Sequence, residues 1–191
     1  MNNLAKHSDP VYESALEKYN TTFISENWKV QETKKKAYIV IRGRHDDDDF
    51  IGAMHTLELD VPKPMKITDN GKGTLIWISP DESLLILEDE LRDKFIKKAN
   101  TAFSDIFAYV IDNSGSFTSL SISGNHYLDV MAKISPYDYQ QLEKHSALST
   151  QLAKAPAIIF RTQTDSLTIL VRFSFADYLW QIIESASSEY T

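Results

Sequence analysis

The stretch that decides the fold is Leu152–Tyr190, LAKAPAIIFRTQTDSLTILVRFSFADYLWQIIESASSEY. It contains two apolar runs, 157–161 and 166–172, with the polar turn 162–165 between them. Short runs rich in Ile, Val, Leu and Phe around polar turn residues predict a β-hairpin. The apolar spacing then becomes helical from about residue 175 to 189, which predicts a helix packed against that hairpin.

The predicted closing helix has one apolar stripe, formed by Phe175, Tyr178, Leu179, Ile182, Ile183 and Ala186. Such a stripe is typical of a helix that covers a core with one face. Ser174 is expected to be the N-cap, with Asp177 as its partner in a capping box. Trp180 falls off the stripe, so we expect it at the rim of the core or on an outer face.

The chain contains an internal duplication. Ile41, Gly43, His45 and Asp48 recur as Ile122, Gly124, His126 and Asp129, which lie 81 residues later. The run ESLLIL at 82–87 matches DSLTIL at 165–170 at an offset of 83 residues. Two colinear blocks whose offsets differ by only two residues indicate that two similar units follow one another.

Each half is therefore expected to follow one plan, in which a strand that ends at Gly is followed by a helix, a hairpin and a closing helix. The first half would hold a strand at 38–43, a helix at about 46–57, a hairpin at 74–78 and 83–87, and a helix at about 89–103. The second would hold a strand at 117–124, a helix at about 125–133, the hairpin and the helix described above. Phe107–Ile111 is expected to add a strand at the crossover between the halves. The prediction is an α+β fold of duplicated β-α-β-β-α units.

The composition excludes several classes of function. The 191 residues carry a net charge of −7 and include no cysteine. An acidic surface repels phosphate backbones, so no nucleic-acid partner is expected. Without cysteine the chain has no disulfide, thiolate nucleophile or iron–sulfur ligand. The chain has no apolar run long enough to span a bilayer and no apolar signal segment near Met1, so we expect no membrane contact and a cytoplasmic location.

The expected organisation is an N-terminal arm followed by one domain. Residues 1–36 are polar with scattered apolar positions, and we predict a partly ordered arm that includes a short amphipathic helix on Val11, Tyr12, Ala15, Leu16 and Tyr19. Residues 37–191 are expected to form the domain, with internal repeats at about 37–105 and 106–191. Trp28 favours an arm that becomes ordered on a partner, because a free arm would leave this side chain exposed.

Sequence motifs for catalysis, cofactors or metals are weak, and we predict no catalytic, cofactor-binding or metal-binding residue. His45 with the acidic run 46–49 resembles a hard-metal cluster but has no EF-hand spacing, and a solvated acidic helix start is favoured. The paired His45 and His126 are explained by the duplication. Asn70–Gly73 lacks the spacing of a phosphate-binding loop, and the chain has no dinucleotide or nucleophile-elbow motif.

Four residues are candidates for contacts with another subunit: Trp28, Arg161, Arg172 and Trp180. Arg161 and Arg172 sit at ends of paired strands, where two guanidinium groups could hold a carboxylate. A salt-bridge pair at the sheet edge and an intersubunit contact are equally open readings. Trp and Arg are enriched among the residues that dominate binding energy at interfaces, which favours Arg172 and Trp180 as contacts.

Several stretches resemble the gamma subunit of heterotetrameric sarcosine oxidase. The first is the closing block, which contains VRFSFADYLW at 171–180. The second is SPDESLL at 79–85, which is similar to the family's GPDEWLLL. The third is LSISG at 120–124 with VMAK at 130–133, which is similar to the family's LRLSG and LLAK. Together these stretches span about 37–190 in the family's order. Ser135 stands where many relatives carry Cys, which argues against a thiol role there and favours a structural one.

The resemblance implies a non-catalytic accessory subunit of a flavoenzyme complex. That complex oxidises sarcosine to glycine and passes the one-carbon unit to tetrahydrofolate or releases it as formaldehyde. FAD, FMN, NAD, tetrahydrofolate and zinc are expected in the alpha, beta and delta subunits, and none in this chain. The implied fold is similar to the folate-binding aminomethyltransferase domain.

Other functions remain open from the sequence. A related complex, N-methylglutamate dehydrogenase, uses a similar small subunit, so the oxidised substrate could differ. A stand-alone folate-binding protein would suit the fold, although the chain lacks the Cys that folate-binding repair relatives carry. An unrelated α+β interaction module with similar hairpins is the third possibility.

Overall fold

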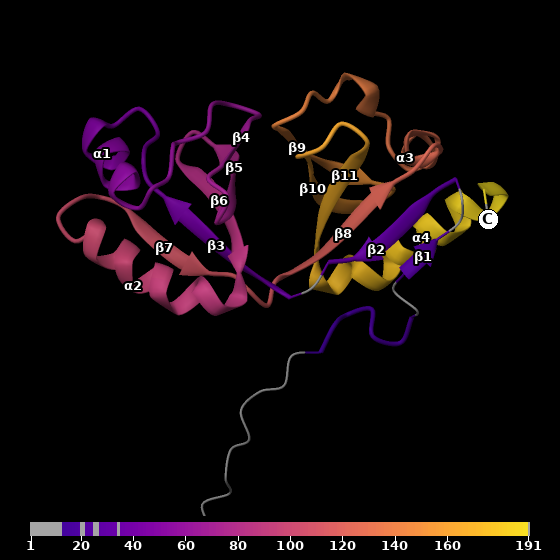
Figure 1. Ribbon diagram of the computed structural model, residues 1–191, viewed down its shortest axis with the longest axis horizontal. Coiled ribbons are helices and arrows are strands. Elements are labelled where there is room, and N and C mark those ends of the chain that lie inside the picture. The colour runs from indigo at the N-terminus through magenta and orange to yellow at the C-terminus, as the bar shows by residue number, and fades with distance from the viewer. Residues whose placement is uncertain (1–12, 20–21, 25–26, 34, 191) are drawn as a thin grey trace, which may run out of the picture.

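The computed structural model describes residues 13–19, 22–24, 27–33 and 35–190. In this part of the chain, strands form a six-stranded sheet and a five-stranded sheet. Figure 1 shows the sheets side by side, with α1 (Asp48–Thr56) and α2 (Arg92–Ala102) beside one and α3 (Tyr127–Ile134) and α4 (Ala176–Ser187) beside the other. The predicted α+β class is confirmed.

Both sheets are antiparallel throughout. The five-stranded sheet runs in the order β4 (Ile67–Asp69), β5 (Gly73–Ser79), β6 (Glu82–Glu88), β3 (Lys36–Arg42), β7 (Tyr109–Asp112). The six-stranded sheet runs β1 (Thr22–Ile24), β2 (Lys29–Glu32), β8 (Phe117–Ser123), β11 (Ser166–Arg172), β10 (Ala155–Arg161), β9 (Ser146–Leu152).

The two halves follow the predicted plan. The first half runs β3, α1, β5, β6, α2, and the second runs β8, α3, β10, β11, α4. Strand neighbours correspond as well, because β3 pairs with β6 as β8 pairs with β11. Each half also has a strand that the sequence did not predict, β4 beside β5 and β9 beside β10. β4 is only three residues long, and β9 (SALSTQL) is mostly polar, so neither has a strong apolar pattern.

Each sheet includes a strand from the segment that precedes the other half. β2 precedes β3 in the chain but pairs with β8 of the second half. β7 precedes β8 but pairs with β3 of the first half. The segment before each half therefore completes the other half's sheet, and the two halves cannot separate without breaking both pairings.

The core has three parts. One cluster lies between the five-stranded sheet and α1 and α2, and includes Ile39, Phe50 and Leu85. A larger cluster lies between the six-stranded sheet and α3 and α4. Between the sheets lies the third, in which Val40 and Leu84 of one sheet meet residues such as Phe160 of the other. The chain is thus layered as helices, sheet, sheet and helices, with helices on the two outer sides (Figure 1).

The N-cap prediction for the closing helix is wrong. α4 begins at Ala176, and Ser174 lies in the 3-10 turn η3 (Phe173–Phe175) that precedes it. A matching 3-10 turn, η1 (Asp89–Leu91), precedes α2. Asp177 does not close a capping box, because its carboxylate pairs with Lys18 at 2.7 Å and accepts a hydrogen bond from Tyr19.

Trp180 is buried, with 1% of its surface exposed, and is not on an outer face. The reason is the segment 13–19, which covers that side of α4. Leu16 is fully buried there, and the ring of Tyr19 lies 6.0 Å from that of Trp180. Conversely, Phe175 and Tyr178, which were placed on the buried stripe, are more than a third exposed.

The predicted N-terminal helix is not present in the described residues. Ala15, Leu16 and Tyr19 lie in a turn, and Val11 and Tyr12 lie outside the described residues. The division into an arm at 1–36 and a domain at 37–191 with repeats at 37–105 and 106–191 stays a prediction. Within the arm, β2 is part of the six-stranded sheet, which a loosely attached tail would not be.

Gly124 is expected to be essential for attaching the N-terminal segment. Its φ is +102°, and a Cβ there would lie 2.7 Å from Trp28 Cα and 2.8 Å from the Asn27 carbonyl oxygen. Alanine at this positive φ strains the backbone, and its Cβ clashes with main-chain atoms rather than with a flexible side chain. Gly124→Ala should therefore lower the free energy of unfolding by about 3 kcal/mol.

Chemical denaturation of the two single variants Gly124→Ala and Gly115→Ala tests this expectation. A Cβ at Gly115 meets nothing within 4 Å, so that variant should change stability by less than about 0.5 kcal/mol. Equal stability of both variants would show that the close approach at Gly124 is not required.

Candidate binding pocket and contact surface

Three of the four residues predicted at a subunit interface lie inside this chain. Trp28 and Trp180 are each 1% exposed and Arg161 is 7% exposed, whereas Arg172 is exposed. The two tryptophans belong to the core beside α3 and α4. Of the four, Arg172 alone presents its side chain to the surface, and the interface prediction itself stays a prediction.

Arg161 and Arg172 cannot hold one carboxylate together. They lie at opposite ends of the β10–β11 hairpin, separated by about 17 Å of strand. Arg161 donates hydrogen bonds to the carbonyl oxygens of Tyr139, at 2.9 Å, and Thr164, at 2.5 Å. It therefore fixes the loops around the hairpin turn. Arg172 stacks over the ring of Phe117, with 4.5 Å between guanidinium carbon and ring centroid.

An exposed apolar stripe runs along β7 and the residue pair before it. Phe107 is 95% exposed, Tyr109 46% and Ile111 43%. Tyr109 and Ile111 point to one face of β7, while Ala108 and Val110 pack against the core beside α2. The strand begins two residues later than predicted, so Phe107 lies in the turn just before it. Three large exposed apolar side chains within five residues of the chain form a patch that is typical of a contact surface.

The stripe lies on the inner face of the five-stranded sheet, where the other sheet no longer covers it. Ile111 pairs across the ladder with Val40, which is buried between the sheets. β7 is also the edge strand, so one side of its backbone has no strand neighbour in the described residues. An open edge of this kind can accept a further strand.

A groove of about 230 Å³ continues this surface between the sheets. It is lined mainly by apolar residues, among them Val40, Ile78, Phe117, Ile158 and Leu170. One cation, Arg172, and one anion, Glu82, also line it. Val40 joins the groove to the β7 stripe, because Ile111 is its cross-strand partner. The stripe and the groove together form what we call the β7 surface, defined by Phe107, Tyr109, Ile111, Ile78 and Arg172.

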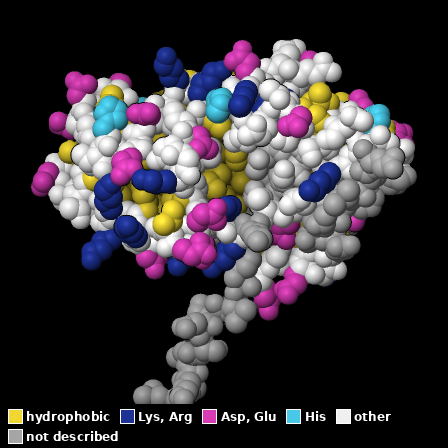
Figure 2. All heavy atoms as spheres, in the orientation of Figure 1, with side chains coloured by type: hydrophobic (Ala, Val, Ile, Leu, Met, Phe, Trp, Pro, Cys, Tyr) yellow, Lys and Arg dark blue, Asp and Glu magenta, His cyan; other side chains and the backbone are white. Residues whose placement is uncertain are grey.

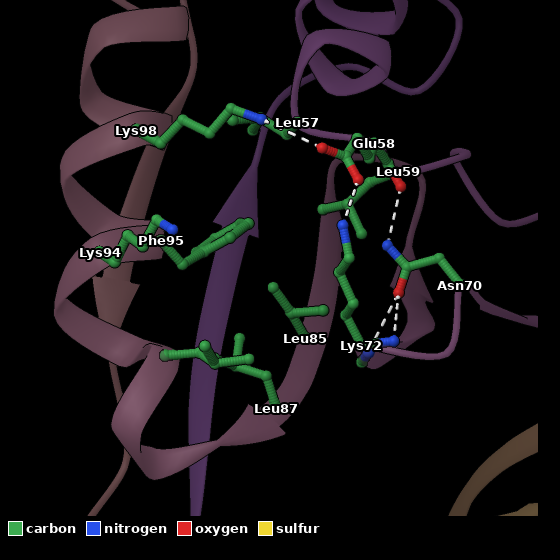
Figure 3. Close-up of a pocket in the computed structure, with 12 residues that line it drawn as sticks. Leu57, Glu58, Leu59, Asn70, Lys72, Leu85, Leu87, Lys94, Phe95 and Lys98 are labelled. Carbon is green, nitrogen blue, oxygen red and sulfur yellow. Dashed lines mark hydrogen bonds and ion pairs between the residues drawn. The ribbon is translucent and has the colours of Figure 1, made fainter.

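A separate pocket of about 270 Å³ lies between α2 and the outer face of the five-stranded sheet (Figure 3). Its floor is apolar and consists of Leu57, Leu59, Leu85, Leu87 and Phe95. Figure 3 shows Lys94 and Lys98 on the helix side and Asn70 and Lys72 on the loop side. Figure 2 shows hydrophobic side chains reaching the surface of the half that carries α1 and α2, with charged side chains around them.

One carboxylate stands among the lysines at the mouth of this pocket. Glu58 pairs with Lys72 at 2.6 Å and lies 3.8 Å from Lys98. The hydrogen bond and charge of Lys72, with a further contribution from Lys98, lower the pKa of Glu58 below its usual value. Lys94 has no hydrogen bond or ion pair with any described residue.

Local backbone geometry places Glu58 and Lys72. Glu58 has φ of +63°, and its carbonyl oxygen accepts a hydrogen bond of 2.8 Å from the Asn70 side chain. The Asn70 carboxamide oxygen accepts from the backbone N–H groups of Lys72 and Gly73. The Asn70–Gly73 loop, for which the sequence predicted no ligand role, thus positions one lysine of the pocket.

The histidines near the starts of α1 and α3 serve local structure. Asp47 caps α1 by accepting from the Phe50 N–H, so the acidic helix start is confirmed. His45 lies 3.1 Å from the Ser83 hydroxyl, and burial lowers its pKa. His126 lies 2.9 Å from Asp129. Among residues 13–19, 22–24, 27–33 and 35–190, no three His, Asp or Glu side chains are grouped to hold a metal ion.

Ser135, which stands in place of a cysteine, is buried at the end of α3. Its hydroxyl lies 3.0 Å from that of Tyr139 and accepts from the Tyr137 N–H. These bonds hold the segment after α3, which is a structural role.

The chain matches the model of a known protein family. The model of the sarcosine oxidase, gamma subunit family matches residues 42–189. The sarcosine oxidase subunit gamma of Corynebacterium sp. strain U-96 is 29% identical over 129 residues, which are 66% of this chain and 62% of that relative. The chain thus spans less than two thirds of the length of this curated relative.

Solved structures show the same fold. A chain of the heterotetrameric sarcosine oxidase from Corynebacterium sp. U-96, in complex with pyrrole 2-carboxylate, is similar with a TM-score of 0.84 at 21% identity, over 94% of this chain and 96% of that chain. Aminomethyltransferase T of the glycine cleavage system from Bartonella henselae gives a TM-score of 0.63 at 12% identity, over 81% of this chain and 45% of that chain. The predicted likeness to an aminomethyltransferase domain is confirmed for the fold. No helix in the described ranges combines the length and apolar character needed to cross a bilayer.

Proposed function

The chain belongs to the sarcosine oxidase gamma subunit family, and we propose that it is a non-catalytic structural subunit of a heterotetrameric sarcosine oxidase-type complex. The observation that carries this proposal is the family match over 42–189, since the match includes both halves of the duplication. The fold likeness to a chain of a heterotetrameric sarcosine oxidase, at 96% coverage of that chain, supports it.

In this proposal the chemistry belongs to partner subunits. The complex oxidises sarcosine to glycine in the cytoplasm, and its alpha, beta and delta subunits hold FAD, FMN, NAD, tetrahydrofolate and zinc. The residues described here support a scaffold role, because the buried polar side chains serve local structure. Arg161 binds loop carbonyls, and Ser135 fixes the end of a helix.

The β7 surface is the contact that we assign to a larger flavoprotein partner. Phe107, Tyr109 and Ile111 offer exposed apolar area, and the open edge of β7 offers backbone hydrogen bonds. Aromatic side chains dominate binding energy when an interface excludes water from them. Arg172 lies in the adjoining groove, where a partner carboxylate would find a cation.

Omission of this chain from a co-expressed complex tests the division of labour. The flavin-bearing subunits purified without it should retain bound flavin but be less stable or less completely assembled. The purified chain alone should show no visible flavin absorbance and no sarcosine turnover. Sarcosine oxidation by the isolated chain would contradict the proposal decisively.

A further inference from the structure

We propose that the pocket between α2 and the five-stranded sheet binds a small amphipathic carboxylate, with an apolar body on the leucine floor and its head group between Lys94 and Lys98. This site lies on the outer side of the sheet, whereas the β7 stripe lies on the inner face. The proposal is independent of the scaffold role, and either can fail without the other.

The floor of the pocket suits an apolar body. Leu57, Leu59, Leu85 and Leu87 are buried below it, and Phe95 points into it from α2 (Figure 3). Leu91 also lines the pocket and is 39% exposed. A ligand chain laid on this floor would remove its own apolar surface and that of Leu91 from water, which favours binding in proportion to the area buried.

The mouth of the pocket suits one anionic head. Lys72, Lys94 and Lys98 contribute three positive charges and Glu58 one negative charge, which leaves +2 in a chain whose net charge is −7. Lys94 and Lys98 lie four residues apart on α2, and like charges at that spacing repel each other. A carboxylate between them would turn this repulsion into two attractions.

Glu58 shows that the site accommodates a carboxylate. Its side chain already occupies part of the cationic mouth, held by Lys72 at 2.6 Å and less closely by Lys98 at 3.8 Å. Lys94 remains without a partner among the described residues. A ligand carboxylate would therefore bind beside Glu58 and compete with it for Lys98.

The combination selects the ligand class. An inorganic anion would use the lysines but leave the leucine floor in water, and a neutral alkyl alcohol would use the floor but not the lysines. A polyanion would meet the negative field of the rest of the chain. A monocarboxylate with an apolar body of modest size uses both features, so we take octanoate as the probe.

Isothermal calorimetry on the full chain tests the site with octanoate, octanol and sulfate. Octanoate should bind saturably with one site, at least about tenfold more tightly than either control ligand, which corresponds to about 1.4 kcal/mol. Lys94→Glu should weaken octanoate about tenfold or more, and Glu58→Gln should strengthen it. The matched control is Lys97→Glu, since Lys97 lies on the same helix but does not line the pocket.

Three results would overturn the proposal. The first is the absence of saturable octanoate binding to the folded full chain. The second is equal weakening by Lys94→Glu and Lys97→Glu, which would indicate only a general charge effect. The third is binding of octanol or sulfate as tight as that of octanoate. None of these results bears on whether the chain joins a flavoenzyme complex.

Discussion

Replacing Trp180 by alanine should lower the free energy of unfolding by about 4 kcal/mol, within the range measured for large-to-small changes at buried tryptophans. Trp180 is 1% exposed and packs in the cluster that also holds Leu16, Leu179 and Ile183. Its ring joins α4 to the segment 13–19 through Tyr19. The substitution would therefore leave a cavity and also loosen the N-terminal segment.

Urea denaturation of Trp180→Ala and Tyr178→Ala provides the comparison. Tyr178 lies on the same helix and is 37% exposed, so its loss should cost less than about 1 kcal/mol. Trp180→Phe should cost less than Trp180→Ala, because the indole N–H of Trp180 has no hydrogen-bond partner in the described structure. Similar stability of Trp180→Ala and Tyr178→Ala would mean that the segment 13–19 does not cover α4 in solution.

Replacing Phe107 by aspartate should weaken assembly with the flavoprotein partner by about 30-fold or more, the effect of losing one central aromatic contact of about 2 kcal/mol. Phe107 is 95% exposed, so the isolated chain should fold as before. The change places a charge on the apolar β7 surface. A partner that covers this surface would bury that charge without an opposite charge beside it.

The measurement is the affinity of purified variants of this chain for the partner immobilised on a surface. Tyr178→Asp is the control, because it introduces the same charge on an exposed aromatic of α4, away from β7. The assignment is supported if both variants keep the circular dichroism spectrum of the unchanged chain and only Phe107→Asp loses binding. Full binding by Phe107→Asp would exclude the β7 surface as the contact.

Local patterns in the sequence were sufficient to predict the strands and helices that bury one apolar face. The β10–β11 hairpin and the closing helix have strong periodicity, and the duplication allowed the weaker first half to be interpreted through the second. The strands β4 and β9 were missed because β4 is only three residues long and β9 is mostly polar. Their pairing depends on the neighbouring strand rather than on their own pattern.

Long-range contacts account for the remaining errors. Helical spacing places Trp180 off the buried stripe of α4, and the segment around Leu16, more than 160 residues away in the chain, buries it. The exchange of β2 and β7 between halves is likewise invisible to local patterns. The 3-10 turn before α4 displaced Ser174 from the cap position that its residue type suggested.

The two proposed contact sites were harder to predict because each combines distant segments. The pocket takes Lys72 from the β4–β5 loop and Lys94 and Lys98 from α2, and none of these lysines belongs to a motif. For the β7 stripe a signal existed, since Phe107, Tyr109 and Ile111 alternate along one predicted strand. That these side chains are left uncovered is seen only in the structure, from their exposure.

Native mass spectrometry and absorbance of a co-expressed assembly test the central claim most directly. Capture through a tag on this chain should recover one copy bound to larger subunits, with flavin absorbance that follows those subunits and not this chain when they are separated. Recovery of this chain free of any flavoprotein, or of flavin bound to the chain by itself, would contradict a cofactor-free scaffold.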